Sequence, residues 1–74
     1  MQAERLVMMA NQIAGFFARE GLETGAAKTA NHLVKFWDPR MRRAIVAHLE
    51  AGGDGLHPLS RAAVTLLTKE AAQP

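Results

Sequence analysis

Hydrophobic residues recur at steps of three and four along four stretches of the chain, which predicts four helices. The first stretch predicts a helix from about residue 3 to residue 20. Gly21 follows it, where a left-handed residue would end a helix, and Leu22 is expected to fold back on Phe17. Gly15 lies inside this helix, where it is either simply tolerated or needed for the close approach of another backbone. The predicted apolar face consists of Leu6, Met9, Ile13, Phe16 and Phe17.

The second predicted helix has Thr24 as its N-cap and ends by Trp37. This helix is apolar on more than one side, because Phe36 and Trp37 are adjacent in sequence and point about 100° apart. A two-layer bundle does not need both rings in one core, so one of the two is a candidate for contact with a partner. The main apolar stripe consists of Ala26, Ala30, Leu33, Val34 and Trp37, and the solvent-facing strip of Lys28, Asn31 and Lys35.

Two prolines mark the starts of the remaining helices. Asp38 and Pro39 are typical of an N-cap and a first helical position, so the third helix is predicted from Pro39 to about Ala51, with a stop at Gly52. Pro58 begins the fourth helix, and residues 71–74 are expected to fray. The predicted fold is therefore all-α, a single domain over residues 1–74 made of about four short helices with short loops. Its core is expected to contain Met9, Ile13, Phe17, Leu33, Ile45, Leu49, Leu59, Leu66 and Leu67.

The composition of the chain limits the functions that such a small helical protein can have. The chain has 74 residues, of which 49% are hydrophobic, and many of these are alanine, so the core is small and burial against a partner is expected. Without cysteine there is no disulfide and no thiolate metal site. The net charge of +2 is weak evidence for nucleic-acid binding. No apolar run approaches the roughly 20 residues of a membrane span, and the first residues lack a signal-peptide pattern, which favours the cytoplasm.

Residues with catalytic or metal-binding chemistry do not form a recognisable motif. The glycine-rich segment 52–55 follows a helix and lacks a phosphate-binding lysine, so it is interpreted as a helix stop and a turn. His32, His48 and His57 are not spaced to place two imidazole rings on one helix face. His48 is expected to be a hydrogen-bonded histidine at the edge of the core. We therefore expect no catalytic, cofactor-binding or metal-binding residue in this chain.

The most unusual segment is residues 36–43, with the sequence Phe-Trp-Asp-Pro-Arg-Met-Arg-Arg. Three arginines lie in the first turns of a helix, where positive charge opposes the helix dipole. A solvated surface is one interpretation. A docking patch is the second, because Trp and Arg dominate the energetics of protein interfaces, and phosphate binding is the third. The residues predicted to contact a partner are Phe36, Trp37, Arg40, Arg42 and Arg43.

Several of these motifs together resemble a known family. They are the segment from Met9 to Ile13 followed by Phe16 and Phe17, and the segments 32–33, 36–42 and 52–59. The chain resembles, from about Leu6 to Leu67, the delta subunit of bacterial NAD-dependent formate dehydrogenases, which are cytoplasmic multisubunit enzymes containing molybdenum or tungsten. The resemblance implies a small accessory subunit without a cofactor of its own.

The resemblance also implies the partners. The molybdenum or tungsten pterin, the iron–sulfur clusters, the flavin (FMN) and the NAD site belong to the larger formate dehydrogenase subunits, which this chain is expected to contact. A homodimer is an expectation for the isolated chain. The hypothesis is thus a non-catalytic subunit that supports assembly or stability of the complex, without nucleic-acid or membrane binding. Two alternatives of other classes are a small helical nucleic-acid-binding module and a self-associating helical protein.

Overall fold

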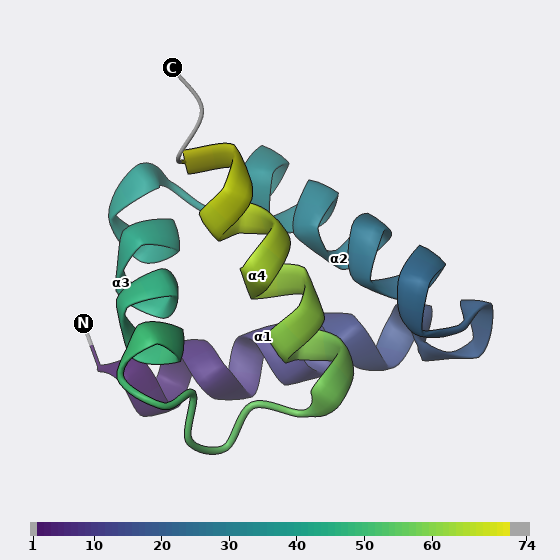
Figure 1. Cartoon of the computed structure of the whole chain (residues 1–74), viewed down its shortest axis with the longest axis horizontal. Helices are drawn as coiled ribbons and strands as arrows, with labels where there is room; N and C mark the ends of the chain where they lie inside the picture. The colour runs from purple at the N-terminus through teal and green to yellow at the C-terminus, as the bar shows by residue number, and fades with distance from the viewer. Residues whose placement is uncertain (1, 72–74) are drawn as a thin grey trace.

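Four α-helices make up most of the computed structural model, which describes residues 2–71 of the chain, with side chains described up to residue 69. Within this part of the chain there is no strand, and the predicted all-α fold with four helices is confirmed (Figure 1). Of the tail expected to fray, residues 72–74 lie outside the described residues and Ala71 is the last residue of α4. The elements are α1 (Ala3–Phe17), the short 3-10 helix η1 (Ala18–Glu20), α2 (Leu22–Phe36), α3 (Pro39–Glu50) and α4 (Pro58–Ala71).

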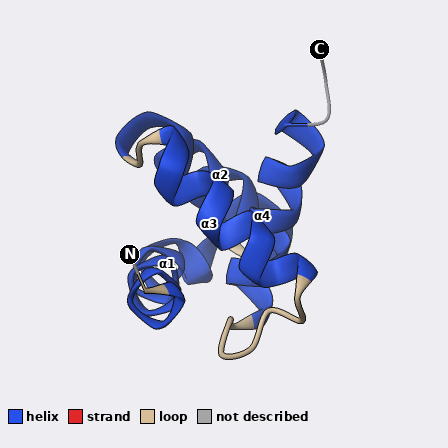
Figure 2. Ribbon diagram, turned by 90° about the vertical axis from the view of Figure 1, so that its left-hand side faces the viewer, coloured by secondary structure: helices blue, strands red, loops and turns tan. Residues whose placement is uncertain are grey.

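The helices cross one another rather than running in parallel. Helix α4 packs most extensively against α2, while α1 contacts all three of the other α-helices. In Figure 1, α1 runs along the lower side of the molecule, and α3 stands beside α4 across from α2. In Figure 2, α1 is seen almost end-on while α2, α3 and α4 lie to one side of it. The core lies where these four helices meet.

Small residues on α1 let it approach the other helices closely. Leu6, Ala10 and Ala14, which are four residues apart, are buried, whereas Phe16 is 84% exposed. The prediction that Phe16 lies on the buried face is therefore wrong. Phe16 lies outside the buried face because that face is rotated toward the line of Leu6, Ala10 and Ala14, where small side chains allow close packing.

The other residues predicted for the core are buried to different extents. Leu33, Ile45 and Leu67 are buried as predicted, and they are joined by Val7, Leu56 and Val64, which were not predicted. Leu56 lies in the loop before α4, where no helical periodicity marks it. The predicted residues that are partly buried and pack against this core are Met9, Ile13, Leu49 and Leu66, while Phe17 and Leu59 are half-buried.

Helix α2 begins earlier than the sequence predicts. Its N-cap is Gly21, with φ 91° and ψ 166°, and not Thr24, which lies within the first turn. Leu22 is 59% exposed and so does not fold back on Phe17. Gly25 lies close to the end of α1, since a Cβ atom there would lie 2.6 Å from the Phe17 carbonyl oxygen. Only glycine allows the first turn of α2 to lie this close to the end of α1.

The boundaries of α3 are confirmed and follow from local hydrogen bonds. The Asp38 side chain accepts a hydrogen bond of 2.9 Å from the Met41 N–H, and Pro39 occupies the first helical position. At the other end, the Gly52 N–H donates to the Leu49 carbonyl and the Gly53 N–H to the His48 carbonyl. These are the two bonds of a Schellman ending, which satisfy carbonyls that a helix leaves without partners.

The loop between α3 and α4 is held from three sides. The His48 side chain contacts the Asp54 carbonyl at 2.7 Å, which confirms its prediction as a hydrogen-bonded residue at the core edge, and Arg61 donates to the Gly52 and Gly53 carbonyls. From α1, the Asn11 Oδ1 atom accepts from the Ser60 hydroxyl at 2.7 Å and from the His57 N–H at 3.1 Å. Asn11 Nδ2 also donates to the Gly55 carbonyl. Asn11 therefore fixes this loop and the start of α4 to α1.

Alanine substitution of two glycines should have opposite effects. Gly15→Ala should raise the free energy of unfolding by about 0.5–1 kcal/mol, because no atom lies within 4 Å of the added Cβ and alanine favours the helix. The structure thus assigns the close backbone approach to Gly25 and not to Gly15. Gly25→Ala should lower the free energy of unfolding by about 1–3 kcal/mol, because backbone must move. Urea unfolding followed by circular dichroism measures both, and a neutral or stabilising Gly25→Ala would contradict this packing.

Removing the Asn11 side chain should loosen the loop before α4. Asn11→Ala should lower the free energy of unfolding by about 1–3 kcal/mol, because the buried Ser60 hydroxyl loses its partner. Asn31→Ala is the matched control on the exposed face of α2 and should change stability by less than about 0.5 kcal/mol. Equal effects of the two substitutions in thermal unfolding would show that Asn11 does not hold the loop.

Candidate functional site

The residues predicted to contact a partner lie at the turn between α2 and α3. Trp37 lies at the end of α2. Its backbone is extended, and its N–H donates to the Leu33 carbonyl at 3.0 Å, which ends α2. The side chain is only 5% exposed and belongs to the hydrophobic core. In this structure Trp37 therefore does not present a surface to another protein. It fixes the corner to which its neighbours are attached.

Phe36 is the aromatic residue that faces outward. Its side chain is 71% exposed, and its ring lies against the His32 ring with the centroids 4.6 Å apart. The two adjacent aromatics therefore point into different environments, as their angular separation in a helix predicts. Exposed aromatic rings are common anchors at protein interfaces.

Arg42 has an internal role that its position in the sequence does not predict. Its Nη1 atom donates to the Val34 carbonyl at 3.1 Å and also to the Trp37 carbonyl. These carbonyls lie at the C-terminal end of α2, where a helix has unsatisfied acceptors and a partial negative charge. Arg42 stands in the first turn of α3 but complements the dipole of α2. It therefore braces the corner between the two helices.

Arg40 and Arg43 remain exposed on α3. Among the side chains that the structure describes, the one salt bridge joins Lys28 to Glu20 at 2.5 Å, so neither arginine has a carboxylate partner there. Asp38 is engaged as the N-cap of α3. The positive end of α3 thus carries two arginines whose charge is not neutralised by a described side chain.

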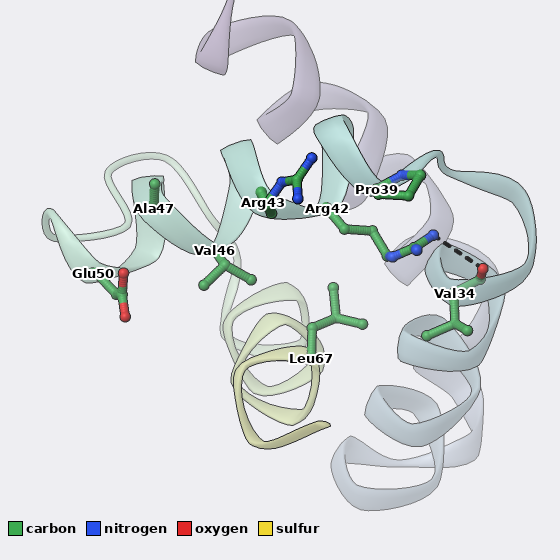
Figure 3. A pocket seen from close by; sticks show the side chains of 8 residues that line it. All are labelled: Val34, Pro39, Arg42, Arg43, Val46, Ala47, Glu50 and Leu67. Atoms are coloured by element: carbon green, nitrogen blue, oxygen red, sulfur yellow. Dashed lines mark hydrogen bonds between the residues drawn. The ribbon is translucent and has the colours of Figure 1, made fainter. Parts of the chain in front are cut away.

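A groove opens between the C-terminal end of α2, α3 and α4, with a volume of about 630 Å³ (Figure 3). In Figure 3, Val46 of α3 and Leu67 of α4 face the space from two sides, and Arg42 reaches across toward Val34. The hydrophobic pattern alone does not predict this groove. The signal for it in the sequence is a second spacing on α3, in which Arg43, Val46 and Ala47 follow Pro39 at helical steps. The lining consists of Val34, Pro39, Arg42, Arg43, Val46, Ala47, Glu50 and Leu67.

Groups capable of metal binding are dispersed over the described part of the chain. No cluster of three or more His, Asp or Glu side chains that could hold a metal ion occurs between residues 2 and 69. No described helix has both the length and the apolar composition needed to cross a membrane. Exposed aromatic rings, arginines and apolar grooves are features common to protein interfaces.

A family model covers most of the chain. The family described as NADH-dependent formate dehydrogenase delta subunit FdsD matches residues 5–64. The matched segment includes Asn11, the corner at residues 36–43 and the loop before α4. No curated protein and no solved structure gives a significant match to the chain. Because the match spans most of the 74 residues, the chain belongs to the family of NADH-dependent formate dehydrogenase delta subunits.

Proposed function

We propose that this chain is a non-catalytic accessory subunit of a cytoplasmic NAD-dependent formate dehydrogenase. In this proposal it supports assembly or stability of the complex through contact with the larger subunits. The observation that carries the proposal is the family match over residues 5–64, because a delta subunit is by its description one part of a larger enzyme. The exposed Phe36, Arg40 and Arg43 supply a surface for that contact.

The chemistry of formate oxidation is assigned by this proposal to the larger subunits. Iron–sulfur clusters are held by cysteine thiolates, and the chain has no cysteine. The molybdenum or tungsten pterin, the flavin (FMN) and the NAD site are likewise placed in the partner subunits. The role of this chain is then to bind and position, and its effect on formate oxidation is indirect.

The contact surface proposed here has an outer and an inner part. Phe36, Arg40 and Arg43 are exposed and would touch the partner. Trp37 and Arg42 lie behind them, the first in the core and the second bonded to the end of α2, and they hold the outer residues in place. Because Asp38 and Arg42 already hold the backbone of the corner by hydrogen bonds, little backbone entropy is lost when the partner binds.

Association should depend on the outer residues. In co-expression with the larger subunits, Phe36→Ala and Arg40→Ala should each reduce recovery of the intact complex about fivefold or more, the effect of losing over about 1 kcal/mol at an interface. Helix content of the free chain should not change, because both side chains are exposed. The matched controls are Met8→Ala and Arg19→Ala, exposed on α1 and η1. Pull-down with formate:NAD activity is the measurement. Undiminished recovery of both variants would place the interface on another face.

Stability should depend on Arg42 and not on Arg40. Arg42→Ala leaves the Val34 and Trp37 carbonyls without this donor, so the free energy of unfolding should fall by about 1–3 kcal/mol. Arg40→Ala should change it by less than about 0.5 kcal/mol. Guanidinium unfolding of the two isolated variants tests the difference. If both arginines prove equally dispensable, the hydrogen bonds of Arg42 do not brace the corner.

A further inference from the structure

The groove between α2, α3 and α4 is apolar inside and cationic at one end. Val46 is partly buried against the core, and Leu67, only 4% exposed, belongs to it, while Val34 is 41% exposed at the edge of the groove. Arg42 and Arg43 lie toward the start of α3, and Glu50 is the one carboxylate of the lining, at the far end of the helix (Figure 3). The groove therefore has a direction defined by charge.

We propose that this groove binds a helix of a partner subunit whose apolar face carries carboxylates at the end that meets Arg43. The inference rests on the proposed function, because it names the binding mode by which the accessory chain would hold its complex. The groove is then a second contact with the partner, in addition to the corner at residues 36–43. The proposal also specifies the chemistry of the segment that fills the groove.

The walls of the groove favour a helix over an extended segment. The backbone groups of α2, α3 and α4 are engaged in helical hydrogen bonds, so the walls offer a strand no ladder to join. A helix satisfies its own backbone and needs only an apolar stripe at steps of three and four. Helix α3, with 12 residues, is about 18 Å long at 1.5 Å per residue, which matches about three turns of the bound helix.

The charges at the start of α3 specify an acidic partner. Arg43 has no carboxylate within salt-bridge distance among the described side chains, and the dipole of α3 adds positive potential at the same end. An aspartate or glutamate on the incoming helix would neutralise this charge and fork onto the guanidinium group. At the other end Glu50 disfavours a second carboxylate and favours a basic or neutral residue.

Two other occupants fit less well. A small molecule needs polar groups that converge inside its pocket, whereas the charged groups here lie at the rim and Arg42 is already bonded to α2. A second copy of the chain has a net charge of +2, so it complements a cationic rim less well than an acidic helix does. An acidic helix from a different subunit meets both the apolar and the electrostatic requirement.

Two substitutions test the groove in the intact complex. Ala47→Trp would fill the groove from the exposed side of α3, and Arg43→Glu would reverse the charge at its rim. Each should lower recovery of the complex about tenfold, the equivalent of about 1.4 kcal/mol, while helix content is kept. The matched controls are Ala27→Trp on α2 and Arg19→Glu on η1, both exposed and outside the groove, and both should be recovered like the wild type.

Photo-crosslinking from position 47 identifies the occupant. With benzoylphenylalanine in place of Ala47 in the assembled complex, we expect a crosslink to a segment of a larger subunit with apolar residues at helical spacing and at least one Asp or Glu. Changing that acidic residue to Lys should then rescue Arg43→Glu. A crosslink to a second copy of the chain, or to a segment without a carboxylate, would overturn the proposal.

The failure of this inference is distinguishable from the failure of the proposed function. If the wild-type chain joins the complex and both groove variants join equally well, the groove is not the binding site, and the accessory role stands. If the wild-type chain does not associate with the larger subunits, both proposals fall together. Loss of the complex with Phe36→Ala but not with Ala47→Trp would place all binding at the corner.

Discussion

The corner between α2 and α3 determines where α3 lies in the bundle. Trp37 enters the core at the residue where α2 ends, Asp38 caps α3, and Arg42 closes the corner by bonding back to the carbonyls of α2. These contacts come from three different residues but fix the same angle between two helices. The position of α3 against α4, and with it the shape of the groove, follows from that angle.

Close helix approach compensates for the small number of large core side chains. Ala10, Ala14, Ala26 and Ala63 are buried, and Gly25 brings α2 against the end of α1. At such contacts the backbones of two helices attract each other by dispersion, whereas larger side chains would hold the helices apart. The buried polar groups are satisfied, with Thr29 bonded to the Gly25 carbonyl and Ser60 to Asn11, so the tight packing leaves no orphaned side-chain atom in the described core.

The sequence was informative where a local signal coincided with the tertiary structure. Asp38 and Pro39 predicted the start of α3, and Gly52 its end, because caps are local hydrogen-bond patterns. Gly25 and Asn11 could not be interpreted in this way. Gly25 lies against Phe17 and Leu59, which belong to other helices. Asn11 bonds to residues 55–60, which are distant in sequence. The spacing of hydrophobic residues does not predict either set of contacts. Phe16 has the spacing and size of a core residue, but the smaller alanines of α1 face the core instead.

The candidate site divides in the same manner. The sequence grouped five residues of one segment as a contact patch, since Trp and Arg are common in interfaces: Phe36, Trp37, Arg40, Arg42 and Arg43. The structure separates them by depth, with Trp37 buried, Arg42 half-buried against carbonyls and the other three in solvent. Arg42 and Arg43, adjacent in sequence, thus have different tasks. The first neutralises the negative end of α2 within the chain, and the second leaves positive charge at the mouth of an apolar groove. In the proposed complex, the carboxylate that pairs with Arg43 comes from the partner subunit.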